Sequence, residues 1–321
     1  MKILSSRDIA SLLQPLELLA AVENALRIYA EGRAVVPDRA HIDFGANTLL
    51  TMPAADERFV GIKLATVVPD NATRQLPVTG GLMTLFDAET GVPLAILDAA
   101  TLTAQRTGAV GAVGVQHMTP EDLSTVGIVG AGVQGTWQAI FACAVRPIEV
   151  VHFVARSDAS AERFVSNVSP RVGRAVRLSR CHDTRELLER SALVITATTS
   201  TEPVLPDDPA LLAGKHFISV GSFKPDMREL PAAALRLSGH LAIDSEAARH
   251  EVGDVIGPVA EGILEPADVF HVAELATGRR SLERSETTAY KTVGMALYDL
   301  CAAQAFYRAA CERAAGRDIE L

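Results

Sequence analysis

The sequence lacks several features that would place a protein in a membrane or on nucleic acid. No stretch of about 18 apolar residues occurs, which argues against a membrane span. Polar residues at 5–8 and at Gln14 interrupt the N-terminal segment, so it lacks the continuous apolar core of a signal peptide. No run of basic residues breaks the net charge of -9. Nucleic acid and anionic membranes are therefore poor candidates for partners.

Cysteine and histidine are few and show no ligand spacing. The chain has 4 cysteines and 8 histidines, which form neither an HExxH motif nor another metal or redox pattern. We therefore expect no metal site. The cysteines are predicted to be buried thiols in a reducing compartment, which favours a cytoplasmic protein. They are Cys143, Cys181, Cys301 and Cys311.

The first third of the chain predicts a helix followed by a mostly antiparallel sheet. The length of 321 residues and the hydrophobic content of 48% are enough for two domains, each with its own core. Residues 15–31 carry apolar side chains at helical spacing and end at Gly32. Short strand-like runs with turn signals between them follow at 41–44, 48–52, 60–68, 81–87 and 93–98.

The middle of the chain changes character twice. Residues 101–118 are rich in Ala and Gly at helical spacing, and because no strand precedes them we expect close helix packing there. From Ser124 onward strands alternate with helices, which is typical of a parallel, doubly wound sheet. The expected strands are 125–129, 149–155, 193–198, 216–220 and 240–243.

The complete pattern predicts an α/β fold with two domains. We expect a Rossmann domain, with its doubly wound parallel sheet, over residues 119–294. It is inserted in a smaller α+β substrate domain formed by residues 1–118 plus about 295–321. Residues 287–315 form one long helix-like run beyond the alternating region, and this run can return to the first domain.

The strongest local signal is the glycine loop Gly-Ala-Gly-Val-Gln-Gly at 130–135, which follows an apolar strand and opens a helix. Gly130 permits the tight turn, Gly132 lets the backbone approach a pyrophosphate, and Gly135 lets the helix pack close to the strand. The free N–H groups at the helix start, around Val133 and Gln134, would hold the phosphate. A tight turn without a ligand is the alternative interpretation.

The end of the next strand bears on the choice of nucleotide. NAD-binding proteins usually place an acidic residue there, which accepts hydrogen bonds from the ribose 2′-hydroxyl. Here Ala155 occupies that position, and Arg156 and Ser157 follow it. A cation and a hydroxyl suit a 2′-phosphate, so we favour NADP over NAD. In the alternative, Arg156 is a solvated loop charge and Asp158 takes the acidic role.

Many ordered motifs make the chain resemble the ornithine cyclodeaminase/μ-crystallin family over nearly its whole length. They lie at 36–39, 60–63, 85–91, 102–109, 127–134, 196–200 and 220–230. The resemblance implies a homodimer formed through the substrate domain and a cleft between the domains. It also implies three cations that hold, or lie near, a substrate α-carboxylate, and these fall on Arg39, Lys63 and Arg106. The cofactor contacts that it implies are Thr79, Arg106, Thr107, Thr196, Thr198, Val220, Gly221 and Val293.

Departures from the cyclodeaminase pattern carry the most information about the reaction. Cyclodeaminases place a catalytic Asp where this chain has Phe223, and a nearby Lys falls on Met227. Phe cannot accept or donate a proton, whereas imine-reducing members of the family lack that Asp. Asp226 is the candidate replacement acid or base, although capping or solvating the loop is its simpler role, and Glu229 is further along the same loop. The Val78-Thr79 pair also reverses the Thr-Val order common in the family.

The sequence therefore predicts an NAD(P)H-dependent reductase of α-imino acids. Δ1-Pyrroline-2-carboxylate and Δ1-piperideine-2-carboxylate, giving proline and pipecolate, are the leading substrates. A protonated imine is already electrophilic, so a carboxylate clamp, a cofactor and a dry pocket suffice. The alternatives are ornithine cyclodeaminase, then an alanine or opine-type dehydrogenase, and then a non-enzymatic binder of the μ-crystallin type.

Overall fold

The computed structural model describes residues 1–320. Its contacts divide the chain into two compact units. Unit 1 comprises Met1–Arg106 and Met295–Leu321, and unit 2 comprises Thr107–Gly294. The boundary falls inside helix α3 (Ala99–Met118).

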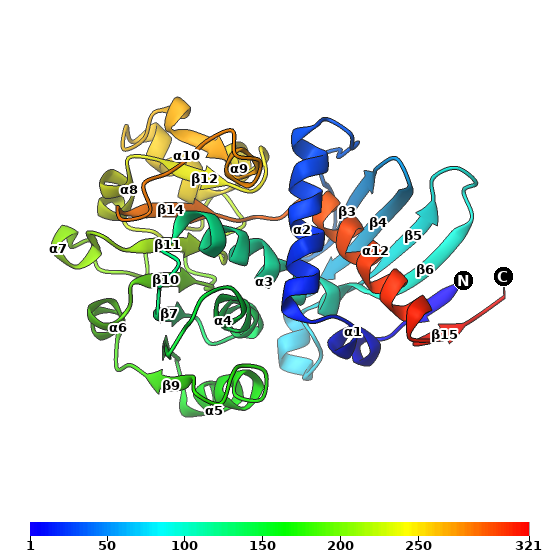
Figure 1. Ribbon diagram of the computed structural model, residues 1–321, viewed down its shortest axis with the longest axis horizontal. Coiled ribbons are helices and arrows are strands. Elements are labelled where there is room, and N and C mark those ends of the chain that lie inside the picture. Colours follow the sequence, from blue (N-terminus) through cyan, green and yellow to red (C-terminus); the bar gives the residue numbers. More distant parts are fainter. Residues whose placement is uncertain (321) are drawn as a thin grey trace. The chain divides into compact units, whose positions relative to one another are not determined.

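Unit 1 is a helix-covered sheet, as expected for the first third of the chain. Its strands follow the order β15-β1-β6-β5-β4-β3-β2, and every neighbouring pair is antiparallel except β1 and β6. Figure 1 shows α2 and α12 side by side across this sheet. The strands are β1 (Lys2–Leu4), β2 (Ala40–Phe44), β3 (Asn47–Ala55), β4 (Phe59–Val67), β5 (Thr79–Asp87), β6 (Pro93–Asp98) and β15 (Arg317–Asp318). The helices are α1 (Ser6–Leu12), α2 (Pro15–Ala30), η1 (Pro69–Arg74) and α12 (Ala296–Glu312).

The two faces of the unit 1 sheet differ in burial. Alternate residues of a strand point to opposite faces, and along β4 Lys63 is buried whereas Val60 is 41% exposed. A side chain at Gly61 would meet Leu300 of α12 at 3.0 Å, so the face that carries Gly61 and Lys63 is the one that α12 covers. The opposite face presents the exposed apolar side chains Val60 and Leu82.

Unit 2 is the predicted doubly wound sheet, and all its strands are parallel. The order is β13-β12-β14-β11-β10-β7-β8-β9, so the chain first builds outward from β7 to β9 and then restarts at β10 on the other side of β7. The strands are β7 (Thr125–Val129), β8 (Val150–Val154), β9 (Arg177–Arg180), β10 (Leu193–Thr196), β11 (His216–Ser219), β12 (Leu241–Ile243), β13 (Val269–His271) and β14 (Thr288–Lys291). The predicted Rossmann fold class is confirmed, with its topological switch point between β7 and β10.

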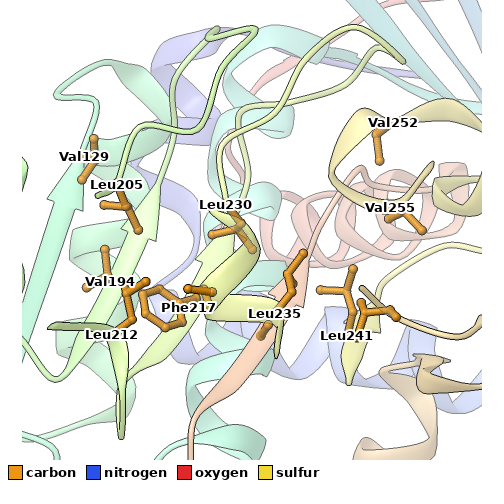
Figure 2. Close-up of a cluster of buried hydrophobic side chains, with 14 of the residues drawn as sticks. Val129, Val194, Leu205, Leu212, Phe217, Leu230, Leu235, Leu241, Val252 and Val255 are labelled. Atoms are coloured by element: carbon orange, nitrogen blue, oxygen red, sulfur yellow. The ribbon is translucent and has the colours of Figure 1, made fainter. Parts of the chain in front are cut away.

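Helices connect these strands and cover the sheet. They are α4 (Val133–Val145), α5 (Asp158–Val168), α6 (Thr184–Arg190), α7 (Pro209–Leu212), α8 (Ala232–Ser238), α9 (Ala248–Glu251), α10 (Gly253–Ala260), η2 (Pro266–Asp268) and α11 (Ala273–Ala276). Figure 2 shows part of the core beneath one group of them, where Val194 and Phe217 from the strands gather with Leu235 and Val255 from the helices. Leu230, fully buried, belongs to the same cluster and anchors the segment that precedes α8.

The prediction of one helix over residues 287–315 is wrong in its first part. Residues Thr288–Lys291 form β14, a fully buried strand between β11 and β12, and the helix begins only at Ala296. The strand is short, and its Lys291 is buried beside Asp254 at 3.8 Å, a partner that lies far away in the sequence. Strands β9 and β13 were also not predicted.

Among the described residues no single helix has the length and apolar character needed to cross a membrane. The bent pair α1 and α2, with 93° between its halves, meets that test only when both helices are counted together.

Candidate functional site

The glycine loop lies where β7 turns into α4. Gly130 has φ of +106°, and a Cβ there would lie 2.5 Å from the carbonyl oxygen of Ala197. A Cβ at Gly135 would lie 2.0 Å from the carbonyl oxygen of Gly130, so the helix must start close against the strand. A Cβ at Gly132 would meet no atom within 4 Å, which leaves open space beside the loop. Gly132 is also the N-cap of α4 and brings no side chain to the first amide groups.

Two further loops lie at the switch point, and the first of them contacts the glycine loop. They follow β10 and β11, the next two strands across the sheet. A Cβ at Gly221 would lie 1.9 Å from the carbonyl oxygen of Thr198, so these loops are in direct contact. Within residues 1–320, Gln134 Oε1 and Thr196 Oγ1 are buried without a hydrogen-bond partner. Open space and orphaned polar atoms at the carboxyl ends of parallel strands fit a dinucleotide.

Helix α3 packs closely on α4, which confirms the interpretation of its small residues. A Cβ at Gly108 would lie 2.6 Å from the ring of Phe141 and 3.0 Å from the carbonyl oxygen of Trp137. Gln138 of α4 donates a hydrogen bond to the carbonyl oxygen of Thr107 at 2.9 Å. Thr107, one of the expected cofactor residues, is therefore fixed against the helix that follows the glycine loop.

At the end of β8 the structure adds a cation, Arg180, that was not expected there from the sequence. Arg156 is exposed, and the Ser157 hydroxyl accepts a hydrogen bond from Ser160 N as the N-cap of α5. The carboxylate of Asp158 pairs with Arg180 Nη1 at 2.6 Å. Arg180 ends β9 and was missed because that strand was not recognised. Asp158 therefore already has a cationic partner beside the position where the ribose is expected.

A buried ion cluster in unit 1 joins two of the three expected substrate cations. Lys63 Nζ lies 2.7 Å from Asp299 Oδ2, and Arg106 Nε lies 2.9 Å from Asp299 Oδ1. Lys63 and Arg106 are 3% and 5% exposed, and Asp299 is fully buried. Asp299 was not among the residues expected from the sequence, although an acidic residue within the apolar run of α12 is a detectable signal.

The protonation of this cluster follows from its burial. Burial lowers the pKa of Lys63 to about 8, although Asp299 acts in the opposite direction. The positive charges of Arg106 and Arg39 lower the pKa of Lys63 further, which places Arg39 within electrostatic reach of the cluster. Burial opposes the ionisation of Asp299, but Arg106 and Lys63 hold its pKa below the usual range.

Three further expected residues lie at the ends of strands, each within its own unit. Thr79 is exposed at the start of β5, paired in register with Val67. Val220 is half-buried directly after β11. The amide of Val293 donates to Asp244 Oδ1 at 2.7 Å, and the adjacent Gly294 amide donates to Oδ2 at 2.8 Å.

The two acidic residues of the loop after β11 differ in burial. Phe223 is 51% exposed, Asp226 is exposed, and Met227 is buried. Glu229 is fully buried, and its carboxylate accepts hydrogen bonds from Thr198, Ser219 and Gly221. Because these contacts occupy both of its oxygens, Glu229 is held in the loop and does not project from it.

The strand order and the glycine loop define a Rossmann-type protein of the dinucleotide-binding class. More narrowly, the chain belongs to the ornithine cyclodeaminase/mu-crystallin family, whose model matches residues 1–314. The resemblance drawn from the sequence motifs is thus confirmed.

Individual relatives match the chain over nearly its whole length, and they include reductases of Δ1-pyrroline-2-carboxylate. The chain is 32% identical to a Δ1-pyrroline-2-carboxylate reductase of Bacillus cereus, over 100% of both chains. The solved Thermococcus litoralis Δ1-pyrroline-2-carboxylate reductase, in complex with NADH and L-proline, matches with a TM-score of 0.91 and 31% identity, over 99% of this chain and 100% of that one. An archaeal alanine dehydrogenase dimer with bound NAD matches with a TM-score of 0.91 and 28% identity, over 100% and 99% of the two chains.

Proposed function

We propose that this protein is an NAD(P)H-dependent reductase of α-imino acids. Its substrates are Δ1-pyrroline-2-carboxylate or Δ1-piperideine-2-carboxylate, and its products are proline or pipecolate. The Bacillus and Thermococcus relatives named above support this proposal, since both are reductases of the smaller imine and one binds NADH and L-proline.

The charge balance of the buried cluster is the observation that carries the proposal. Lys63 and Arg106 bring two positive charges against the single negative charge of Asp299. A buried charge without a counter-ion is costly. A substrate carboxylate would neutralise the excess charge and accept charge-assisted hydrogen bonds. We propose that Lys63 and Arg106, with Arg39 in electrostatic reach, form the carboxylate clamp.

Reduction of a protonated imine requires few further groups from the protein. The reduced nicotinamide, when bound, supplies a hydride to the electrophilic carbon of a protonated imine. Lys63 and Arg106 would fix the carboxylate so that the imine carbon has one orientation. Phe223 has no ionisable group, so it cannot take the acid–base role that ring closure and loss of ammonia require in a cyclodeaminase. Asp226 therefore solvates the loop in this proposal and has no catalytic role.

The cofactor would lie across the switch point of unit 2. The main chain at Gly130, Gly132 and Gly135, with the first amides of α4, would hold the pyrophosphate. The other residues that we assign to cofactor binding are Thr79, Arg106, Thr107, Val133, Gln134, Arg156, Ser157, Thr196, Thr198, Val220, Gly221 and Val293.

NADPH is our proposed preference over NADH. Ala155 leaves the end of β8 without an acid, and Asp158 is paired with Arg180. Arg156 is exposed beside them and can meet a 2′-phosphate. The solved relatives described above contain NADH or NAD, so this preference depends on the local charge pattern alone.

We further propose that unit 1 binds substrate and forms a homodimer through its uncovered sheet face. That face carries Ile42, Val60 and Leu82, which are 54%, 41% and 50% exposed. Apolar side chains gathered on one face are typical of an interface. The archaeal alanine dehydrogenase relative is a dimer, which supports the same assembly.

A cytoplasmic location is also part of the proposal. All four cysteines are free thiols, but the prediction that all are buried is wrong for two of them, since Cys143 is half-buried and Cys311 is exposed. Burial raises the pKa of Cys143 and of Cys301 to about 12, which leaves both thiols protonated and unreactive at neutral pH. Free, protonated thiols suit a reducing compartment.

The clamp is tested by comparing imines that differ only in the carboxylate. Purified protein is assayed with Δ1-pyrroline-2-carboxylate and with 2-methyl-1-pyrroline, following NADPH and NADH oxidation. We expect turnover of the carboxylated imine and a loss of at least about a hundredfold in kcat/KM without the carboxylate. Equal turnover of both imines would contradict a carboxylate clamp.

A further inference from the structure

Glu229 is a fully buried carboxylate whose bonding capacity is filled by the loops around it. Oε1 accepts hydrogen bonds from Thr198 N at 2.6 Å and Thr198 Oγ1 at 2.8 Å. Oε2 accepts from Gly221 N at 2.7 Å and Ser219 Oγ at 2.9 Å. The amides of Thr198 and Gly221 can only donate and they meet different oxygens of the carboxylate, whereas a side-chain amide offers one oxygen and would turn its NH2 group toward one of them.

The partners of Glu229 lie at the carboxyl ends of two neighbouring strands. Thr198 follows β10, and Gly221 follows β11. Without a carboxylate between them, the amides of Thr198 and Gly221 would lose their acceptor. The close contact between Gly221 and Thr198 shows that there is no room for the two loops to rearrange independently. Glu229 therefore holds the loop after β10 and the loop after β11 in a fixed position relative to each other.

A second buried carboxylate holds Glu229 itself in place. Asp254 Oδ1 accepts from the amides of Glu229 and Leu230, at 2.9 and 3.1 Å. Asp254 Oδ2 lies 2.8 Å from the same Ser219 Oγ, so this hydroxyl stands between the two carboxylates, which share its single proton. Lys291 Nζ donates to Ser219 Oγ at 3.1 Å and supplies the opposite charge. Glu229, Asp254 and Lys291 are all fully buried.

The placement of this network suggests what it does. A buried charge costs stability, and an apolar core of the same volume is often at least as stable. The network therefore has a use beyond packing, and what it fixes is main chain at the edge where a dinucleotide binds. In a doubly wound sheet the pyrophosphate lies at the glycine loop, and the β7–β9 half and the β10–β14 half each receive one nucleotide. The ends of β8 and β9 belong to the adenosine half, so the loops that Glu229 joins belong to the nicotinamide half.

We propose that Glu229 is a positioning residue for the nicotinamide half of the cofactor site. It acts through the loops at Thr198 and Gly221 and does not itself contact the reacting atoms. This role holds for any reaction with a nicotinamide cofactor, so it does not depend on the identity of the imine.

The test compares, in the full-length protein, a ligand that lacks the nicotinamide half with the complete dinucleotides. Dissociation constants of ADP, NADH and NADPH are measured by calorimetry for the parent and for Glu229→Gln. We expect ADP to bind within twofold of the parent, and both dinucleotides to bind at least tenfold more weakly. The KM for the dinucleotide should rise, with a smaller change in kcat. Asp268→Asn is the control, because Asp268 accepts a backbone hydrogen bond from Glu265 N at the amino end of β13, whereas the loops joined by Glu229 lie at the carboxyl ends of their strands. It should leave all three constants unchanged.

Three outcomes would overturn the proposal. One is unchanged dinucleotide binding in Glu229→Gln, and another is an equal weakening of ADP and the dinucleotides in folded protein. If Glu229→Gln does not fold by circular dichroism, Ser219→Ala provides the test, because it removes the hydroxyl that lies 2.9 Å from Oε2. In this variant, the factor by which the dissociation constant of NADH rises should be more than three times the factor for ADP. Equal factors for the two ligands are the third contradicting outcome.

Discussion

The carboxylate of Asp299 organises the residues that we assign to the substrate. It accepts from Lys63 and from Arg106 on different oxygens, so each cation has a fixed direction. Charges this deeply buried hold one geometry because water cannot replace their partners. The same burial makes the charge of Lys63 sensitive to pH in a range where exposed lysines are not.

Lys63 should impose a pH dependence on the binding of carboxylates. Its pKa is lowered to about 8, so the side chain is charged below that pH and becomes neutral as pH rises through it. Pyrrole-2-carboxylate is a suitable planar probe, because neither its carboxylate nor its ring N–H titrates in this range. Its dissociation constant should rise by about tenfold between pH values of about 7 and 9.5, as one charged contact is lost.

The Lys63→Met variant is the control for this effect. It should bind the probe weakly at both pH values, because no amine is left to titrate. A parent protein whose affinity for the probe is constant across this range would show that Lys63 does not belong to the clamp.

Arg156 should set the preference for the phosphorylated cofactor. We expect the parent to bind NADPH more tightly than NADH, and Arg156→Ala to weaken NADPH by about tenfold while NADH changes little, because only the 2′-phosphate loses a charged hydrogen bond. Fluorescence titration with both cofactors measures this. Arg163→Ala, on the exposed side of α5, should match the parent. An equal loss for both cofactors, or tighter NADH binding in the parent, would rule the idea out.

At the scale of elements, the parts that were predictable from sequence have strong local signals. The run from β7 through the glycine loop to α4 needs Gly at fixed positions for steric reasons, so the pattern is visible in the residues themselves. Helix α2 and strands β3 to β6 follow their hydrophobic periodicity closely. Strands β5 and β6 are joined by a turn at Gly91, whose φ is +70°, in agreement with the turn signals expected between the strand-like runs.

Elements that depend on distant partners were not predictable in the same way. Strand β14 reads as part of a helix because its pairing with β11 and β12 is invisible locally. Asp299 and Lys63 are far apart in the sequence, as are Glu229 and Thr198, and only the folded chain brings each pair together. Arg180 was missed for the same reason, because it depends on the placement of β9 beside β8.

At the scale of the whole molecule, the uncovered face of the unit 1 sheet bears on assembly. We expect the parent to scatter light as a dimer of about 68 kDa, twice the chain mass of 34.0 kDa. Leu82→Asp should give a monomer, because a carboxylate would be buried in the apolar interface. Leu237→Asp changes a leucine of similar kind, 38% exposed, in unit 2 and should remain dimeric. A monomeric parent would refute the assembly.

The central claim is that this protein reduces an imine and does not deaminate a diamino acid. Its most direct measurement incubates pure protein with ornithine and NAD+ or NADP+ and quantifies ammonia, while a parallel sample follows NADPH oxidation with Δ1-pyrroline-2-carboxylate. Because Phe223 offers no acid or base, we expect no ammonia above background from ornithine, together with rapid oxidation of NADPH by the cyclic imine. Robust ammonia release from ornithine would contradict the account and would identify Asp226 as the replacement acid–base group.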